Sequence, residues 1–313
     1  MLIVCLHCPN TDSIDSFVHV LGRMAVPMFF IITGYFLPLM IQKGRLPGHA
    51  KKILGILVGA TVLYLLLFVI GHHNQSLSSL FEKIVDWKNL PQRILWGRLP
   101  LSMYAGHLWF LVSILYILVM IGLFVKKYPL KNLYVLIPLL FLAGYVISSF
   151  DVDNSLRGYY QNYIFIGFPY VLLGSYINGK MKDIQLKNRT LIMLIIFFFL
   201  IYAFEIFLYV KLGLPSHREH YLAIIPLVSL ILIVAAKNPM IGYRSFITVI
   251  GRKYSVYIYV VHFYIVNNMW LFTHQLPFQS KFHMLASVLV SVLISIFYVK
   301  AKDGMRSLYQ KKS

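Results

Sequence analysis

The chain has 313 residues, of which 59% are apolar and only 12% carry a charge, whereas a typical soluble domain is about half apolar and a quarter charged. With a mean hydropathy of +0.74, these proportions exclude a soluble enzyme, a disordered chain and a fibrous protein. The formal net charge of +19 would indicate a nucleic-acid partner in a soluble protein, and the two cysteines exclude a disulfide framework.

Apolar runs fill most of the chain. About 20 mostly apolar residues make one transmembrane helix, and nine such runs are present, at 20–41, 53–71, 108–125, 132–150, 163–179, 190–210, 221–236, 255–272 and 285–300. Residues 1–9 (MLIVCLHCP) resemble the end of a further helix, whose beginning we expect upstream. No basic residues precede this segment, so we do not expect a signal peptide. The sequence therefore predicts an all-α fold, a polytopic transmembrane bundle of about ten helices with the first truncated. We expect one membrane-embedded domain over 1–313.

The basic residues alternate between the two sides that these spans define. One side has 20 Lys and Arg and two acids, a net charge of +18, in the segments 42–52, 126–131, 178–189, 237–254 and 300–313. The other side has eight Lys and Arg and seven acids, a net charge of +1, in the segments 10–18, 72–107, 151–162, 211–220 and 273–284. Cytoplasmic loops carry the excess of Lys and Arg, so the +18 side is predicted to be cytoplasmic. Both termini are then cytoplasmic once the first helix is completed, and topology explains the basic excess without nucleic acid.

The longest predicted outer loop, 72–107, contains the aromatic and proline residues Trp87, Pro91, Trp96 and Pro100. This composition is typical of a structured or re-entrant lid over the outer face. Tryptophans also anchor helices at the membrane interface, and both interpretations remain open.

His7 lies at the end of the first apolar segment, followed by Asp12. A histidine can accept a proton from a hydroxyl nucleophile at neutral pH, and a nearby acid would orient it. The alternative is an interfacial histidine bonded to a backbone carbonyl. Cys5 and Cys8 have C-x-x-C spacing, but a structural zinc site needs four ligands. We therefore read these cysteines as small apolar helix residues and expect no metal.

Ionisable residues at membrane depth are functional candidates by default. Arg23 precedes a stretch with Pro27 and Gly34, which can loosen a helix and expose its backbone to a cavity. Arg23 would then hold an acid such as Glu205, or it simply reaches the lipid headgroups. His262 falls near mid-membrane, where it needs a polar partner or a wet cavity.

Two clusters on the predicted cytoplasmic side offer cations to the phosphates of a soluble donor. One contains Lys43, Arg45, Lys51 and Lys52, and the other contains Arg252 and Lys253. Lysine and arginine bind phosphate groups, although topology alone demands cations at these positions.

Several segments together resemble the bacterial acyltransferase 3 family of multi-pass membrane acyltransferases. The resemblance covers nearly the whole chain in order. It comprises His7 in IVCLH, Arg23 with VPMFFIITGYFL at 26–37, Lys51 and Lys52, HLWFL from His107, GFP at 167–169 with Gly174, and YSVY at 254–257 leading to His262.

The resemblance implies transfer of an acyl group, usually acetyl, from cytoplasmic acetyl-CoA to a carbohydrate or lipid-linked acceptor. It places the family's proposed catalytic histidine on His7. The family usually has an arginine earlier in the first helix, for which this chain has no position, as we expect of a truncated first helix.

We therefore expect a membrane O-acetyltransferase of the bacterial cell membrane that modifies a cell-surface polysaccharide or its lipid-linked precursor. His7 is expected to act as general base, with Arg23 positioning a carboxylate or the substrate. The secondary candidates are His107, Glu205 and His262, and the candidates for binding acetyl-CoA are Arg45, Lys51 and Lys52. Two alternatives are a transporter or flippase for a glycan precursor or small solute, and a membrane sensing module related to racemase-fused domains.

Overall fold

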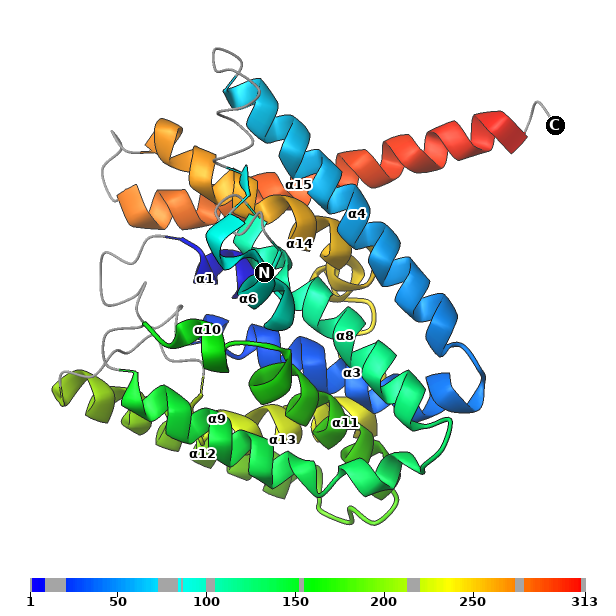
Figure 1. Cartoon of the computed structure of the whole chain (residues 1–313), viewed down its shortest axis with the longest axis vertical. Helices are drawn as coiled ribbons and strands as arrows, with labels where there is room; N and C mark the ends of the chain where they lie inside the picture. Colours follow the sequence, from blue (N-terminus) through cyan, green and yellow to red (C-terminus); the bar gives the residue numbers. More distant parts are fainter. Residues whose placement is uncertain are drawn as a thin grey trace. The chain divides into compact units, whose positions relative to one another are not determined.

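The structure is a computed structural model that describes residues 2–8, 21–72, 84–85, 87–99, 105–151, 155–212, 220–273 and 279–310 (Figure 1). These residues form helices and connecting turns and contain no β-strand, which confirms the all-α prediction. The longer helices are α3 (Ala25–Gln42), α4 (Leu46–Gly71), α8 (Trp109–Phe124), α9 (Leu136–Phe150), α11 (Phe168–Lys180), α12 (Asn188–Lys211), α13 (Ile224–Lys237), α14 (Phe246–Thr273) and α15 (Gln279–Gln310). The short elements are α1 (Leu2–Leu6), η1 (Trp87–Asn89), α6 (Leu90–Leu95), η2 (Gly106–Leu108), η3 (Leu130–Leu133), α10 (Arg157–Tyr160) and η4 (Tyr163–Gly167).

Each of the nine predicted spans contains a helix, although turn or irregular residues remain at 23–24, 125, 134–135 and 221–223. Six helical segments of the described chain are long and apolar enough to cross a membrane, at 25–42, 46–71, 106–124, 130–150, 188–209 and 282–305. Helices α11 and α13 are shorter, with 13 and 14 residues. Helix α14 has 28 residues but carries Arg252 and Lys253 near its beginning. The chain is therefore a helical membrane bundle, as predicted.

Local sequence explains several helix boundaries. Gly44, with a φ of +62°, follows α3, and the next amide, that of Arg45, donates to the Met40 carbonyl oxygen at 2.9 Å. This is the left-handed glycine ending that lets a helix stop and satisfy its last carbonyls. Proline occupies the first or second position of α4 and of α11, where its missing N–H costs no hydrogen bond.

The described residues fall into two compact units. Unit 1 comprises Met1–Ala25 and Pro239–Ser313, and unit 2 comprises Val26–Asn238. The single domain over 1–313 that the sequence predicts stays a prediction.

Unit 1 contains α1, α14 and α15. Helices α14 and α15 pack against each other, and α1 contacts both (Figure 1). The buried side of α15 carries a polar residue at every fourth position, namely His283, Ser287, Ser291 and Ser295. The hydroxyls of the last two donate to backbone carbonyl oxygens one turn earlier, at 2.6 and 2.7 Å, so the helix itself satisfies these buried groups.

Unit 2 contains the helices from α3 to α13. Helix α4 packs on α8, α12 packs on α13, and η4 contacts α8, α9 and α11. Large apolar side chains of α12, including Ile196, Phe197 and Leu200, are exposed. Exposed apolar side chains on a membrane-spanning helix are suited to contact with lipid.

Helices α3 and α11 approach each other closely at two glycines. A Cβ atom at Gly34 would overlap the Val171 carbonyl oxygen, and one at Gly174 would overlap the Ile31 carbonyl oxygen. Small residues permit this approach of backbones in membrane helices. The interpretation of Pro27 and Gly34 as a loosened helix facing a cavity is wrong at Gly34, because α3 is continuous there and the α11 backbone fills the space.

The described part of the 72–107 segment is structured. The Tyr116 hydroxyl donates to the Ile94 carbonyl oxygen at 3.0 Å, and the Gln92 side-chain amide donates to the Tyr159 hydroxyl at 2.9 Å. The Trp96 ring meets the same tyrosine edge-on, with 5.6 Å between ring centroids. These contacts show that the described part is packed on the helices, and the choice between a lid and an interface anchor stays open. Residues 73–83, 86 and 100–104 lie outside the described residues.

Arg98 joins this segment to α10. Its guanidinium donates to the carbonyl oxygens of Arg157 and Gln161, both at 3.4 Å. Burial, together with the charges of Arg157 and Arg93, lowers the pKa of Arg98 below its usual value. Because arginine titrates so far above neutral pH, this side chain stays charged while it holds the two segments together.

Candidate active site

His7 begins the turn that ends α1. Its amide donates to the Val4 carbonyl oxygen at 3.1 Å, and its side chain is half-buried within unit 1. The imidazole lies beside two residues of α14. Its ring centroid is 5.3 Å from that of His262 and 5.2 Å from that of Phe263, which it meets edge-on.

His262 is fully buried in α14. Its Nδ1 atom lies 2.7 Å from the Tyr259 carbonyl oxygen and 3.2 Å from the Ile258 carbonyl oxygen. A carbonyl oxygen can only accept a hydrogen bond, so Nδ1 carries a proton, and Nε2 is the nitrogen at which the ring can gain or lose one. The helix backbone therefore fixes both the orientation and the tautomer of His262 next to the His7 ring.

The structure thus brings together two residues that the sequence marked separately, one primary and one secondary candidate. Two imidazolium charges at this spacing would repel each other, so at most one of the two rings carries a positive charge at a time. Histidine is the side chain that general acid–base catalysis uses most often.

The model of the acyltransferase 3 family, described as an acyltransferase domain, matches residues 1–300. The chain belongs to the acyltransferase 3 family. No curated protein and no solved structure matches the chain significantly. Membership makes the chain an acyltransferase, and its long apolar helices make it a membrane protein.

The second candidate catalytic residue, Arg23, and the two cysteines also belong to unit 1. Arg23 is half-buried in the turn before α3, in the same unit as His7. Asp12, the predicted orienting acid, lies outside the described residues. Cys5 and Cys8 are free thiols, and the buried Cys8 thiol donates to the Val4 carbonyl oxygen at 3.5 Å. Cys8 is therefore buried in a bend directly after α1, whereas Cys5 lies within α1, as we expected of a helix residue.

The HLWFL block of the acyltransferase lies in unit 2. His107 is buried, and its ring centroid is 5.2 Å from that of Tyr64 on α4. Phe110 packs on Phe30 of α3 at 4.7 Å between ring centroids. This block connects α3, α4 and α8 through aromatic packing, and the catalytic role of His107 stays a prediction.

Glu205 of α12 binds backbone amides of unit 2. Its carboxylate oxygens accept from the amides of Leu222 and Ala223, at 3.0 and 3.2 Å, immediately before α13. A carboxylate is stabilised at such a helix beginning, where amides lack partners within the helix. The geometry gives Glu205 a structural role, and its pairing with Arg23, which belongs to unit 1, stays a prediction.

The predicted donor-binding cations Arg45, Lys51 and Lys52 are all exposed on the first turns of α4 or just before it. Their spacing places them at one end of the helix. They are accessible to an anionic ligand, and their role in donor binding stays a prediction.

Sequence reasoning missed His283, which is buried on α15 and hydrogen-bonded to the Val266 backbone of α14. Val266 lies one turn beyond His262 on the same helix. The signal was available, because a polar residue recurs every fourth position from His283 through three serines, the helical period that marks one face.

Proposed function

We propose that the protein is a bacterial cell-membrane O-acetyltransferase. It transfers an acetyl group from acetyl-CoA to a hydroxyl of a cell-surface polysaccharide or its lipid-linked precursor. The observation that carries this proposal is the contact between His7 and the buried His262, in a chain that belongs to an acyltransferase family.

The chemistry follows from one base beside one fixed imidazole. The acceptor hydroxyl oxygen attacks the thioester carbonyl carbon, a C–O bond forms, and the C–S bond breaks. The hydroxyl proton goes to His7 and then to the departing thiolate, which leaves as CoA. An alternative with the same balance forms acetyl-His7 first and passes the acetyl group to the hydroxyl in a second step.

His262 is a positioning residue in this proposal. Its ring is held by the Tyr259 and Ile258 carbonyl oxygens, so it supports the His7 ring in one orientation. Arg23 positions a carboxylate or the substrate. Arg45, Lys51 and Lys52 contribute positive charge on the cytoplasmic side that attracts the donor phosphates, and the acceptor enters from the outer side. The basic segments, including the C-terminal residues 300–313, face the cytoplasm.

Replacement of His7 tests the proposal. In purified membranes supplied with acetyl-CoA labelled in its acetyl group, His7→Ala and the similarly sized His7→Gln should both reduce transfer to glycan about 10²-fold or more, as expected for loss of a general base. Membrane insertion should be intact. His72→Ala, at the residue directly after α4 in unit 2, is the matched histidine control and should transfer at the wild-type rate.

Unchanged acetylation in both His7 variants would remove this residue from the mechanism. Absence of acetyl transfer in the wild type, together with uptake or flipping of a glycan precursor, would favour the transporter alternative. NMR of O-acetyl groups on surface glycan from cells with and without the protein identifies the acceptor.

A further inference from the structure

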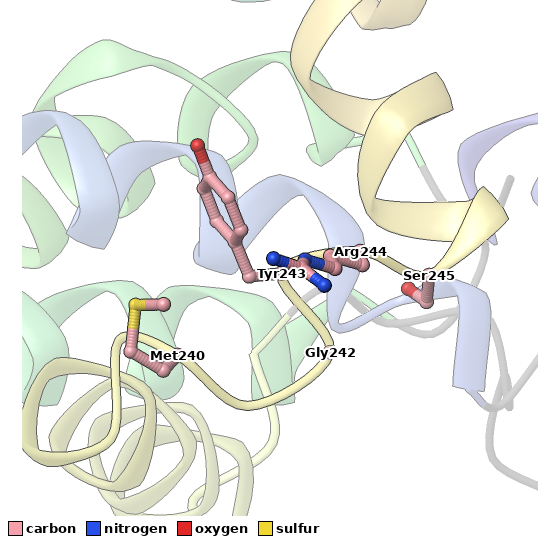
Figure 2. Close-up of a pocket in the computed structure, with 5 residues that line it drawn as sticks. All are labelled: Met240, Gly242, Tyr243, Arg244 and Ser245. Atoms are coloured by element: carbon pink, nitrogen blue, oxygen red, sulfur yellow. The ribbon is translucent and has the colours of Figure 1, made fainter.

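The loop before α14 forms a hollow on the surface of unit 1. It has a volume of about 380 Å³ and is lined by Met240, Gly242, Tyr243, Arg244 and Ser245 (Figure 2). This volume falls within the range of small-molecule sites. Gly242 has a φ of +68°, a left-handed conformation that glycine adopts without strain, and the chain turns there to form the hollow.

Cations surround this hollow. Arg244 lines it directly, and no described residue forms a hydrogen bond or ion pair with Arg244. The Arg252 guanidinium, from the second turn of α14, lies 5.2 Å from the centre of the Tyr243 ring, a cation–π contact that keeps a second guanidinium beside the loop. Lys253 is exposed next to it. The segment 237–254 contains no acidic residue, so no negative side chain within it offsets the positive charges that attract an anion.

We propose that this hollow, with Arg244 and Arg252, binds the phosphate groups at the nucleotide end of the acyl donor. The inference rests on the proposed function, which supplies CoA as the donor. Arginine binds phosphate through a planar, doubly donating guanidinium, and Tyr243 supplies an aromatic wall of the kind that nucleotide sites use.

The position of the hollow along α14 matches the shape of such a donor. Arg252 and His262 are ten residues apart on one continuous helix, which is about 15 Å at 1.5 Å per residue. In CoA the thioester lies at the far end of the long pantetheine arm from the phosphates. One helix therefore carries both a phosphate site on the predicted cytoplasmic side and, deeper in the membrane, the histidine that contacts His7.

A phospholipid headgroup offers the same phosphate chemistry. Met240, Ile241, Phe246 and Ile247 around the hollow are each at least 72% exposed, and apolar side chains beside arginines are also found where a loop meets anionic lipid. The test must therefore separate a soluble phosphate donor from a lipid.

The experiment measures the Kd of CoA and of dephospho-CoA, which lacks the 3′-phosphate, for the full chain in nanodiscs of phosphatidylcholine alone. The test variant is Arg244→Gln/Arg252→Gln. The matched control is Lys126→Gln/Lys127→Gln, which removes two exposed charges from another predicted cytoplasmic loop. A parallel series contains phosphatidylglycerol, with retention of that lipid by the purified protein as its readout.

We expect the double arginine variant to bind CoA at least about tenfold more weakly, since one charge-assisted hydrogen bond accounts for about a tenfold change in Kd. Dephospho-CoA should bind the wild type more weakly than CoA does, and its affinity should fall less in the arginine variant. The lysine control should bind both ligands as the wild type does.

Equal CoA binding by wild type and arginine variant overturns the inference and leaves the proposed function standing. The inference is also overturned by a change in phosphatidylglycerol retention alone. A wild type that binds no CoA overturns both. The two tests can also differ. If CoA binding depends on the arginines but the His7 variants still transfer acetyl groups, the inference is supported and His7 is removed from the proposed function.

Discussion

The two units use the same kind of family motif for different purposes. In unit 2 the motif residues Gly34 and Gly174 bring the backbones of α3 and α11 together, and the HLWFL block packs aromatic rings on α3 and α4. In unit 1 the motif residues His7 and His262 bring two imidazoles into contact. The motif residues of unit 2 therefore pack helices together, whereas the histidine pair of unit 1 is the one to which we propose a chemical role.

Gly174→Ala should disrupt the packing of α3 on α11 and cause the largest loss of stability among these variants. The added Cβ would overlap the Ile31 carbonyl oxygen, and backbone cannot move aside as a side chain can. We expect a loss of about 3 kcal/mol in stability, the upper part of the range for overpacking, measured as the unfolding midpoint in detergent. Acetyl transfer should fall only in proportion to the folded fraction.

The matched control is Gly59→Ala in α4, where an added Cβ meets no atom of the described residues within 4 Å. Alanine is favoured over glycine within a helix by about 1 kcal/mol, so this variant should be as stable as the wild type or more so. Equal stability of the two alanine variants would contradict the close approach of α3 and α11.

His262→Ala tests the proposed role of the histidine pair of unit 1 in acetyl transfer. Loss of the ring that supports His7 should lower kcat about 30-fold, a barrier change of about 2 kcal/mol, while KM for acetyl-CoA stays near the wild-type value. His262→Asn retains a side-chain donor for the Tyr259 carbonyl oxygen and should recover stability without recovering kcat. A variant that lost stability but kept kcat per folded molecule would assign His262 to packing alone.

Asn162→Ala tests a structural residue of unit 2 that is as fully buried as His262. Asn162 is fully buried, and its side-chain oxygen accepts from the amides of Ile164 and Phe165 at 2.9 and 3.2 Å. Loss of this cap should cost about 1.5 kcal/mol of stability with kcat unchanged. A kcat that falls as far as in His262→Ala would show that burial alone does not distinguish the two units.

The helices were predictable from the sequence because hydrophobicity and length alone determine a membrane span. The same reasoning found His7 and His262 as isolated ionisable residues, since charge at membrane depth is visible in a sequence. Their mutual contact was not predictable, because it joins α1 to α14 across most of the chain. The role of Gly34 was misread for the same reason, since what fills the space at a glycine belongs to another helix.

Glu205→Gln gives the smallest expected effect and decides between two readings of one carboxylate. The sequence paired Glu205 with Arg23, whereas the structure gives its oxygens the amides of Leu222 and Ala223. Glutamine keeps one side-chain oxygen as acceptor and loses the other, so stability should fall by about 1 kcal/mol, with kcat and KM unchanged. The Arg23 partnership predicts a different result, because a neutral side chain would release the arginine and lower kcat at constant folded fraction. Comparison with Arg23→Gln completes the test, since two partners in one ion pair give non-additive losses when both are replaced. Independent, additive effects would assign Glu205 to the beginning of α13 and leave Arg23 to the unit that contains His7.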